Sequence, residues 1–130
     1  MNKAIETRLA PAAIGPYSQA IDDGEAVYCA GQIGLDPATG RLVEGGIEAE
    51  TRRALENLRA VLDAAGLGLD AIVKTTVFVV DLADFEVVNR IYGEHFNPPY
   101  PARSTVQAAA LPRRARVEIE AIARRPRRAR

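Results

Sequence analysis

Hydrophobic and polar residues alternate in two stretches near the N-terminus, and this pattern predicts a β-hairpin. The stretches are residues 17–21 and 26–33, with Asp22-Asp23-Gly24 between them. Aspartate and glycine tolerate the positive φ angles of a tight hairpin turn. A second turn signal, residues 36–40, precedes residues 41–43, which we interpret as a short return strand.

Two segments have the three- and four-residue spacing of amphipathic helices. The stripe of the first helix stops at Gly66 and consists of Ile47, Ala54, Leu55, Leu58, Val61, Leu62 and Ala65. Its other side predicts a solvated face made of Glu48, Glu50, Arg52, Arg53, Glu56 and Arg59. The second helix begins after Asp84, which we expect to cap it. Its stripe, with Asn89 beside it, is Phe85, Val88, Tyr92 and Phe96.

The remaining hydrophobic stretches predict three more strands and a self-associating surface. Residues 72–80 are apolar on both alternating sets, which is typical of a central strand covered on both faces. Residues 103–109 and 116–123 follow proline-containing breaks, and Val117 and Ile122 again place apolar side chains on both faces. Two helices cover only one face of such a sheet, so we expect a homo-oligomer with its sheets turned inward.

Composition and charge indicate one globular domain with a basic end. The chain has 130 residues, of which 48% are hydrophobic, and its 17 basic residues balance 17 acidic ones. Five arginines lie in residues 124–130, which leaves a net charge of −5 on the rest of the chain. We expect a domain over residues 1–123 and a disordered tail over 124–130, with an RNA- or partner-binding arm as the alternative.

Single copies of cysteine and histidine restrict the chemistry. Cys29 has no cysteine to pair with and alternates within an apolar strand, so we interpret it as a core thiol. His95 alone cannot build a two-histidine ribonuclease site or a histidine-rich metal site within one subunit. No apolar run is long enough for a signal peptide or a membrane span, and we therefore expect a cytoplasmic protein.

A few polar side chains are candidates for a site. Glu118 and Glu120 share one face of the last predicted strand, either as surface carboxylates on an edge strand or with one partly buried and holding a water. The planar guanidinium of Arg103 suits a substrate carboxylate, or it forms a structural ion pair. Asn89 either contacts a ligand or ties down a loop, and Tyr17 either lines a cleft or packs in the core.

Five blocks of sequence closely resemble the RidA/YjgF family of imine deaminases. In chain order they are AIGPYSQA (13–20), GQI (31–33), VKTTVFV (73–79), PARS (101–104) and EIEAIA (118–123). The resemblance covers the chain from about residue 5 to residue 123. It implies an α+β, chorismate-mutase-like subunit whose six-stranded, mainly antiparallel sheet carries two helices on one face. It also implies a homotrimeric barrel with clefts between subunits.

The same resemblance implies a hydrolase that acts on C=N bonds of small 2-imino or enamine acids, such as 2-iminobutanoate and 2-iminopropanoate, and releases 2-keto acids and ammonia. Arg103 would grip the substrate carboxylate, and Glu118 would position and activate the attacking water. Tyr17, Asn89 and the backbone around Ala30, Gly31 and Thr105 would line the cleft. A protonated imine is already electrophilic, so neither a metal nor an organic cofactor is expected.

Two positions depart from the family pattern, and three other functions compete with the deaminase. Ala30 and Thr105 stand where close family members have serine and cysteine, which affects substrate preference and excludes thiol-based regulation at residue 105. A regulatory protein that binds a small carboxylate without turnover is the first alternative. An endoribonuclease is the second, although the acidic body argues against a nucleic-acid partner. A chaperone-like holdase is the third.

Overall fold

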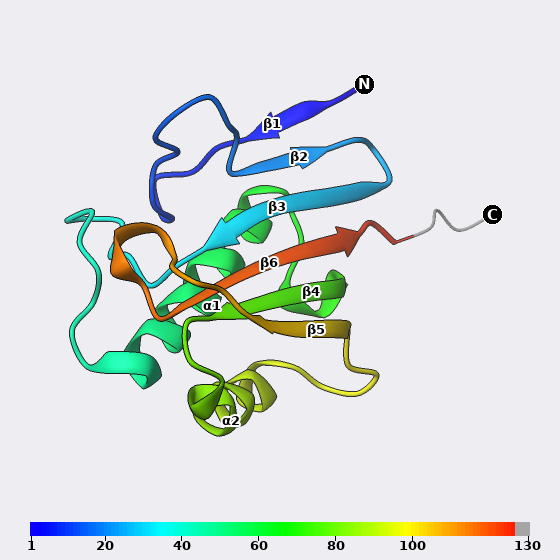
Figure 1. Cartoon of the computed structure of the whole chain (residues 1–130). Helices are drawn as coiled ribbons and strands as arrows, with labels where there is room; N and C mark the ends of the chain where they lie inside the picture. Colours follow the sequence, from blue (N-terminus) through cyan, green and yellow to red (C-terminus); the bar gives the residue numbers. More distant parts are fainter. Residues whose placement is uncertain (127–130) are drawn as a thin grey trace.

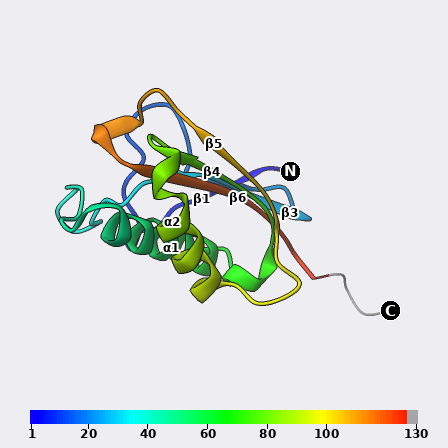
Figure 2. The same ribbon diagram turned by 60° about the horizontal axis from the view of Figure 1, so that its bottom comes forward.

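A six-stranded sheet forms the centre of the molecule, and both α-helices pack against the same face of it (Figures 1 and 2). The structure is a computed structural model, and it describes residues 1–126. The strands are β1 (Lys3–Ile5), β2 (Ala20–Asp22), β3 (Ala26–Gln32), β4 (Ile72–Val79), β5 (Ala102–Gln107) and β6 (Val117–Arg124). Their order is β1-β2-β3-β6-β4-β5, in which only β4 and β5 are parallel. The predicted α+β class, the hairpin and the mainly antiparallel sheet are confirmed.

The sixth strand is not the one that the sequence pattern predicts. It is β1, which pairs with the outer edge of β2 and is too short to show alternation. Residues 41–43 contribute a single bridge, between Leu35 and Leu42. Their backbone instead closes the local loop, because Asp36 N donates to Arg41 O at 2.8 Å and Val43 N donates to Gly34 O at 2.9 Å. The prediction of a return strand is therefore wrong.

Helix α1 (Gly46–Ala64) ends where the sequence predicts. Gly66 adopts a φ of 78° and donates to Asp63 O, while Leu67 N reaches back to Leu62 O, which together form a Schellman cap. One prediction about this helix is wrong, because Glu50 is not solvated but only 1% exposed. Burial is tolerated because its carboxylate accepts a hydrogen bond from Arg116 N at 2.8 Å.

Helix α2 (Phe85–His95) follows a short 3₁₀ turn, η2 (Leu82–Asp84). Asp84 makes no side-chain capping bond, so the predicted cap is wrong. The cap belongs to Asp81 one turn earlier, whose side chain accepts from Ala83 N at 2.9 Å. Two further 3₁₀ turns, η1 (Leu69–Ala71) and η3 (Pro112–Arg114), lead into β4 and β6.

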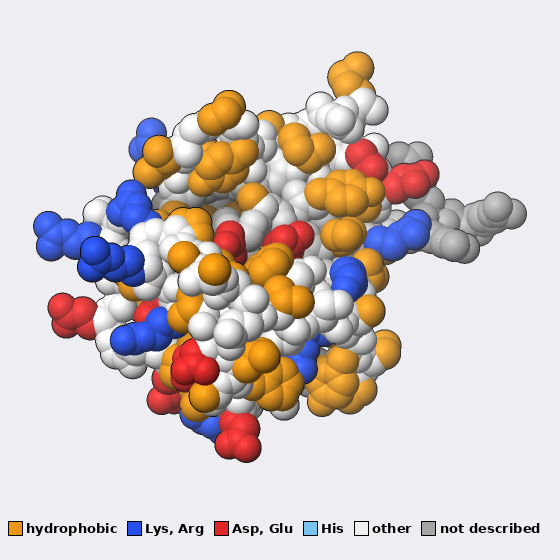
Figure 3. All heavy atoms as spheres, viewed as in Figure 1, with side chains coloured by type: hydrophobic (Ala, Val, Ile, Leu, Met, Phe, Trp, Pro, Cys, Tyr) orange, Lys and Arg blue, Asp and Glu red, His pale blue; other side chains and the backbone are white. Residues whose placement is uncertain are grey.

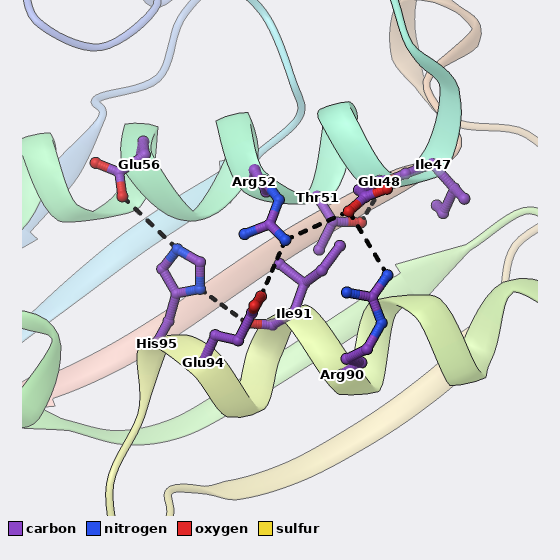
Figure 4. A network of polar contacts seen from close by, with 9 residues as sticks. All are labelled: Ile47, Glu48, Thr51, Arg52, Glu56, Arg90, Ile91, Glu94 and His95. Atoms are coloured by element: carbon purple, nitrogen blue, oxygen red, sulfur yellow. Dashed lines mark hydrogen bonds and ion pairs between the residues drawn. The ribbon is translucent and has the colours of Figure 1, made fainter.

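Ion pairs on the outer surface join the two helices (Figure 4). Arg52 of α1 lies 3.4 Å from Glu48 on its own helix and 3.1 Å from Glu94 of α2. His95 lies between the helices, with Nδ1 2.8 Å from Ile91 O and Nε2 3.7 Å from Glu56. Exposed pairs of this kind contribute about 0–1 kcal/mol each, so the main attachment of α2 is its buried apolar stripe.

Alternation along the central strands separates a packed face from an open one. On β6, Val117, Ile119, Ala121 and Ala123 are buried beneath the helices, whereas Glu118 and its alternate neighbours point to the other face. That open face exposes Tyr28 at 47% and Val106 at 42%. Figure 3 shows hydrophobic side chains over much of this face and acidic ones near its middle. One chain therefore leaves uncovered a face that carries exposed apolar side chains together with acidic ones.

The predicted tail, residues 124–130, begins inside the ordered region. Arg124 is the last residue of β6. The Arg125 guanidinium pairs with the Asp22 carboxylate and donates to Ala65 O at 2.7 Å. Residues 127–130, which carry the rest of the predicted tail, lie outside the described residues.

Candidate functional site

Glu118 lies on a central strand and packs directly against the backbone of β3. Its strand, β6, runs between β3 and β4, so the interpretation of these glutamates as residues on an edge strand is wrong. The register between β3 and β6 shifts between Cys29 and Gln32, which brings Gly31 beside Glu118. A Cβ on Gly31 would lie only 2.8 Å from Glu118 Cδ. Any side chain at position 31 would therefore displace this carboxylate.

The surroundings of Glu118 make its carboxylate a stronger base than an ordinary glutamate. Burial raises its pKa, and the neighbouring charge of Glu120 raises it further. The carboxylate lines a pocket of about 630 Å³ that also includes Tyr17, Ala30 and Gly31. Four residues predicted to form the site thus meet at one pocket. A carboxylate of this kind is suited to taking a proton from a bound water.

Tyr17 is exposed, so its alternative interpretation as a core residue is wrong. The first strand of the hairpin, predicted to begin at Tyr17, begins only at Ala20, and Tyr17 lies in the turn before it. Gly15, at a φ of 115°, makes this turn, and Tyr17 N donates to Gly15 O at 2.9 Å. The ring is 54% exposed at the pocket mouth.

Gln19 secures the loop that forms one wall of this pocket, a role that sequence reasoning missed. Its side chain accepts from Thr7 N at 2.7 Å and donates to Thr7 O at 3.0 Å and Pro11 O at 2.8 Å. The residue is only 3% exposed. A buried glutamine that bonds the backbone of Thr7, Ala10 and Pro11 is a structural clamp, and no hydrophobic pattern predicts it.

Arg103 lies at the other edge of the sheet, on β5, and is held by α2. Its Nη2 donates to Asn89 Oδ1 at 2.9 Å, and its Cζ lies 4.8 Å from the ring centroid of Tyr92. Within residues 1–126 it forms no ion pair, so the alternative of a structural ion pair is wrong. Asn89 contacts this side chain rather than tying down a loop. Arg103, Asn89, Tyr92 and Tyr100 line a second pocket of about 470 Å³.

The two groups of site residues lie on opposite faces of the sheet. Arg103 pairs with Thr75 of β4, which is buried beneath the helices. Glu118 pairs with Phe78 of the same strand, and residues three apart in a strand point to opposite faces. Thr105 follows Arg103 by two residues and shares its face. One chain therefore does not bring the predicted Arg103 and Glu118 pair together.

Two buried polar residues of α1 support the walls of the Glu118 pocket. Asn57 is fully buried, and its Nδ2 donates to Ile33 O at 3.0 Å and Leu35 O at 2.9 Å. Glu50 holds the backbone of Arg116, which directly precedes β6. Sequence reasoning missed both roles. The sequence did contain a signal for their burial, since positions 50 and 57 share the three- and four-residue spacing of the buried stripe.

Other polar features add no reactive group to either pocket. Cys29 is buried, which confirms its interpretation as a core thiol, and burial raises the pKa of this thiol to about 12. Within residues 1–126 there is no cluster of three histidine, cysteine or acidic side chains placed to hold a metal ion. No helix in the same part of the chain is long and apolar enough to cross a membrane.

The chain is similar to known proteins over nearly its whole length. Residues 7–125 match the family model described as endoribonuclease L-PSP. A mouse protein named 2-iminobutanoate/2-iminopropanoate deaminase is 53% identical over 123 residues, which are 95% of this chain and 91% of the relative. RidA from an Antarctic Psychrobacter superposes with a TM-score of 0.91 at 46% identity, covering 94% and 98% of the two chains. Escherichia coli TdcF with bound serine superposes with a TM-score of 0.88 at 45% identity, covering 95% and 99%.

Proposed function

We infer that this chain, which belongs to the endoribonuclease L-PSP family, also called RidA/YjgF, is an imine deaminase that hydrolyses 2-iminobutanoate and 2-iminopropanoate. Mouse and human relatives at 53% and 48% identity carry the name of that activity. The structural observation that carries the function is the Glu118 carboxylate, partly buried against Gly31 with a raised pKa. A base of this strength at a pocket wall is what the addition of water to a C=N bond requires.

In the proposed mechanism Glu118 is first a base and then an acid. Its carboxylate takes a proton from a water as the water oxygen bonds to the carbon of the protonated imine, and the C=N π electrons move to nitrogen. The resulting carbinolamine then collapses as the Glu118 carboxyl returns a proton to nitrogen. Ammonia leaves, the Glu118 carboxylate takes the proton of the carbinolamine hydroxyl, and the oxygen becomes the carbonyl of the 2-keto acid. Transfer of this proton to ammonia or solvent restores the carboxylate. The raised pKa favours both transfers, because it brings the group closer to the operating pH.

Arg103 binds the substrate carboxylate in this proposal, and a second copy of the chain completes the site. Arg103, with Asn89 and Thr105, faces away from Glu118 in a single chain, so the two groups meet only if they come from neighbouring subunits. Serine bound to TdcF supports capture of a small acid with an α-carboxylate. The exposed apolar side chains of the open face support a homotrimeric barrel with clefts between subunits.

A binding protein without turnover is the remaining candidate, because TdcF is recorded with bound serine. A ribonuclease has less support, because His95 lies between the helices rather than at either pocket. The proposal involves no nucleic-acid partner, no metal and no organic cofactor. We also propose a cytoplasmic location.

The decisive assay follows freshly generated 2-iminobutanoate in competition with semicarbazide, with wild type beside Arg103→Ala and Glu118→Ala. We expect rapid hydrolysis by wild type and near-complete loss in both variants, which thermal unfolding should show to be folded. Losing a charged bidentate contact of about 3–4 kcal/mol reduces kcat/KM about 200- to 1,000-fold for Arg103→Ala. A wild-type rate equal to buffer favours the binding protein, and near-normal turnover by folded Arg103→Ala contradicts the role of Arg103.

Mixing the two inactive variants tests whether the site is shared between subunits. If Arg103 and Glu118 come from different chains, random co-assembly gives both native groups to about a quarter of the clefts. We therefore expect denatured and co-refolded mixtures to regain about a quarter of wild-type activity. Each variant refolded alone is the control, and no regain in the mixture contradicts the shared cleft.

A further inference from the structure

We propose that Tyr92 is a positioning residue that holds the Arg103 guanidinium ready for the substrate carboxylate. This inference rests on the proposed role of Arg103 in binding that carboxylate. Nothing in the sequence pattern gives Tyr92 a role beyond the apolar stripe of α2. The inference therefore rests on what the tyrosine contacts on each side.

Tyr92 is itself fixed from two directions. Its hydroxyl lies 2.8 Å from Thr75 Oγ1, and Thr75 is fully buried in β4 beneath the helices. Its ring stacks on Phe96, with 4.4 Å between the centroids and 30° between the planes. Burial also raises the pKa of Tyr92, which keeps the hydroxyl protonated and able to hydrogen-bond. The tyrosine is 4% exposed, so its ring is part of the rigid core.

Arg103 lies over this fixed ring. Its Cζ is 4.8 Å from the Tyr92 centroid and 5.5 Å from that of Phe85, both within the range of a cation–π contact. Asn89 accepts from Nη2 at 2.9 Å, which is the only hydrogen bond of the guanidinium within residues 1–126. The arginine is thus held by two aromatic rings and one hydrogen bond. Most of its N–H edge, which pairs with carboxylates, is left for a ligand.

The chemistry of the reaction determines whether kcat or KM changes when Arg103 loses the support of Tyr92. The carboxylate of a 2-imino acid carries the same charge in the substrate and in the transition state for water addition. A contact to it therefore stabilises both states equally, and weakening that contact raises KM while kcat stays nearly constant. Preorganisation by Tyr92 lowers the entropy cost of binding, so its loss also appears in KM. Loss of a purely structural tyrosine would not raise KM while leaving kcat nearly constant.

The experiment compares Tyr92→Leu with Tyr92→Phe and with Phe96→Leu. Tyr92→Leu removes the ring under Arg103, and we expect KM for 2-iminobutanoate to rise about five- to tenfold with kcat within about twofold. Tyr92→Phe keeps the ring, and KM should stay within about twofold of wild type. Phe96→Leu is the matched control, because Phe96 is 5% exposed in the same stack, whereas Arg103 lies over the rings of Phe85 and Tyr92; it should raise KM less than Tyr92→Leu does.

A second substitution keeps the inference testable if Tyr92→Leu does not fold. Phe85 is 37% exposed, so Phe85→Leu should fold and raise KM about two- to threefold through the same guanidinium. The inference is overturned if Phe96→Leu raises KM as much as Tyr92→Leu, or if the Tyr92→Leu defect lies in kcat. It is also overturned if Phe85→Leu leaves KM unchanged.

Calorimetric binding of 2-oxobutanoate separates this inference from the proposed function. A wild-type protein that binds the keto acid without hydrolysing imines contradicts the deaminase proposal alone. In that case a weaker Kd in Tyr92→Leu than in Phe96→Leu still supports the positioning of Arg103. Equal Kd values in the two variants contradict it, whatever the activity.

Discussion

Substitution of Gly31 by alanine tests whether the position of the Glu118 carboxylate determines the rate. Gly31 has no positive φ, so alanine fits its backbone without strain. The added methyl group, however, would lie 2.8 Å from Glu118 Cδ, where ordinary contacts begin at 3.4 Å. The carboxyl carbon must therefore move by about 0.6 Å, and the oxygen next to it by more. The perturbation acts on the base while the rest of the pocket keeps its residues.

The expected loss follows from the size of this displacement. A misplacement of about 1 Å at a reacting group costs up to about 100-fold in rate, so a shift of about 0.6 Å or more predicts a 10- to 100-fold lower kcat. KM should change by less than about threefold, because the substitution does not alter the proposed contact between Arg103 and the substrate carboxylate. Steady-state hydrolysis of 2-iminobutanoate measures both constants, and thermal unfolding checks that the variant is folded.

A double-mutant cycle assigns the effect to Glu118. In a Glu118→Gln background the base is already absent, so Gly31→Ala should change the residual rate by less than about twofold. Glu118→Asp shortens the side chain, and it should reduce the further cost of Gly31→Ala. A folded Gly31→Ala enzyme with kcat within twofold of wild type would refute the placement of the reacting water at Glu118. The same placement would be refuted if Gly31→Ala lowered the rate equally in the wild-type and Glu118→Gln backgrounds.

Three further predictions concern charge and buried polar groups. Because Glu120 raises the pKa of Glu118, Glu120→Gln should move the acidic limb of the kcat/KM profile to lower pH, and an unmoved or raised limb contradicts the coupling. Because the pKa of Glu118 is raised in the folded chain, its stabilising contribution is present in acid and is lost as pH rises through that pKa. Denaturant unfolding should therefore find Glu118→Gln more stable than wild type at pH 7 but not in acid. Asn57→Ala leaves two buried carbonyls without their donor and should lower the free energy of unfolding by about 2–4 kcal/mol. The control, Arg53→Ala, removes only a bond to the Asn57 oxygen and should lower it by less than about 1 kcal/mol.

Hydrophobic periodicity was sufficient for most of the fold. The stripe ending at Gly66 predicts α1 to within a residue at each end, and the β-branched residues 72–80 cover all of β4 and one residue beyond it. The failures are short elements decided by tertiary contacts. β1 has three residues and exists because β2 offers it an edge, whereas residues 41–43 bond within their own loop. No periodicity of two can be recognised in segments of that length.

Hydrophobic periodicity also failed to predict the buried polar side chains, but for a different reason. Glu50 and Asn57 occupy positions with core spacing, yet their residue types argue for solvent. Their burial depends on partners that are distant in the sequence, the backbone of Arg116 and the carbonyls of Ile33 and Leu35. A polar residue in the apolar stripe of a helix therefore predicts a loop held against that helix, and here the loops are the walls of the pocket.

The division of the site follows from strand register, which the sequence pattern does not contain. Both Arg103 and Glu118 can be assigned to strands from their neighbours, but their relative faces depend on how each strand is aligned with β4. The parallel register places Arg103 opposite Thr75, and the antiparallel register places Glu118 opposite Phe78. Thr75 and Phe78 are three residues apart on β4, so Arg103 and Glu118 lie on opposite faces of the sheet. A shift of one residue in the register of either strand would place them on the same face. A site that needs both groups can be built from this sheet only where Arg103 of one copy reaches the open face of another.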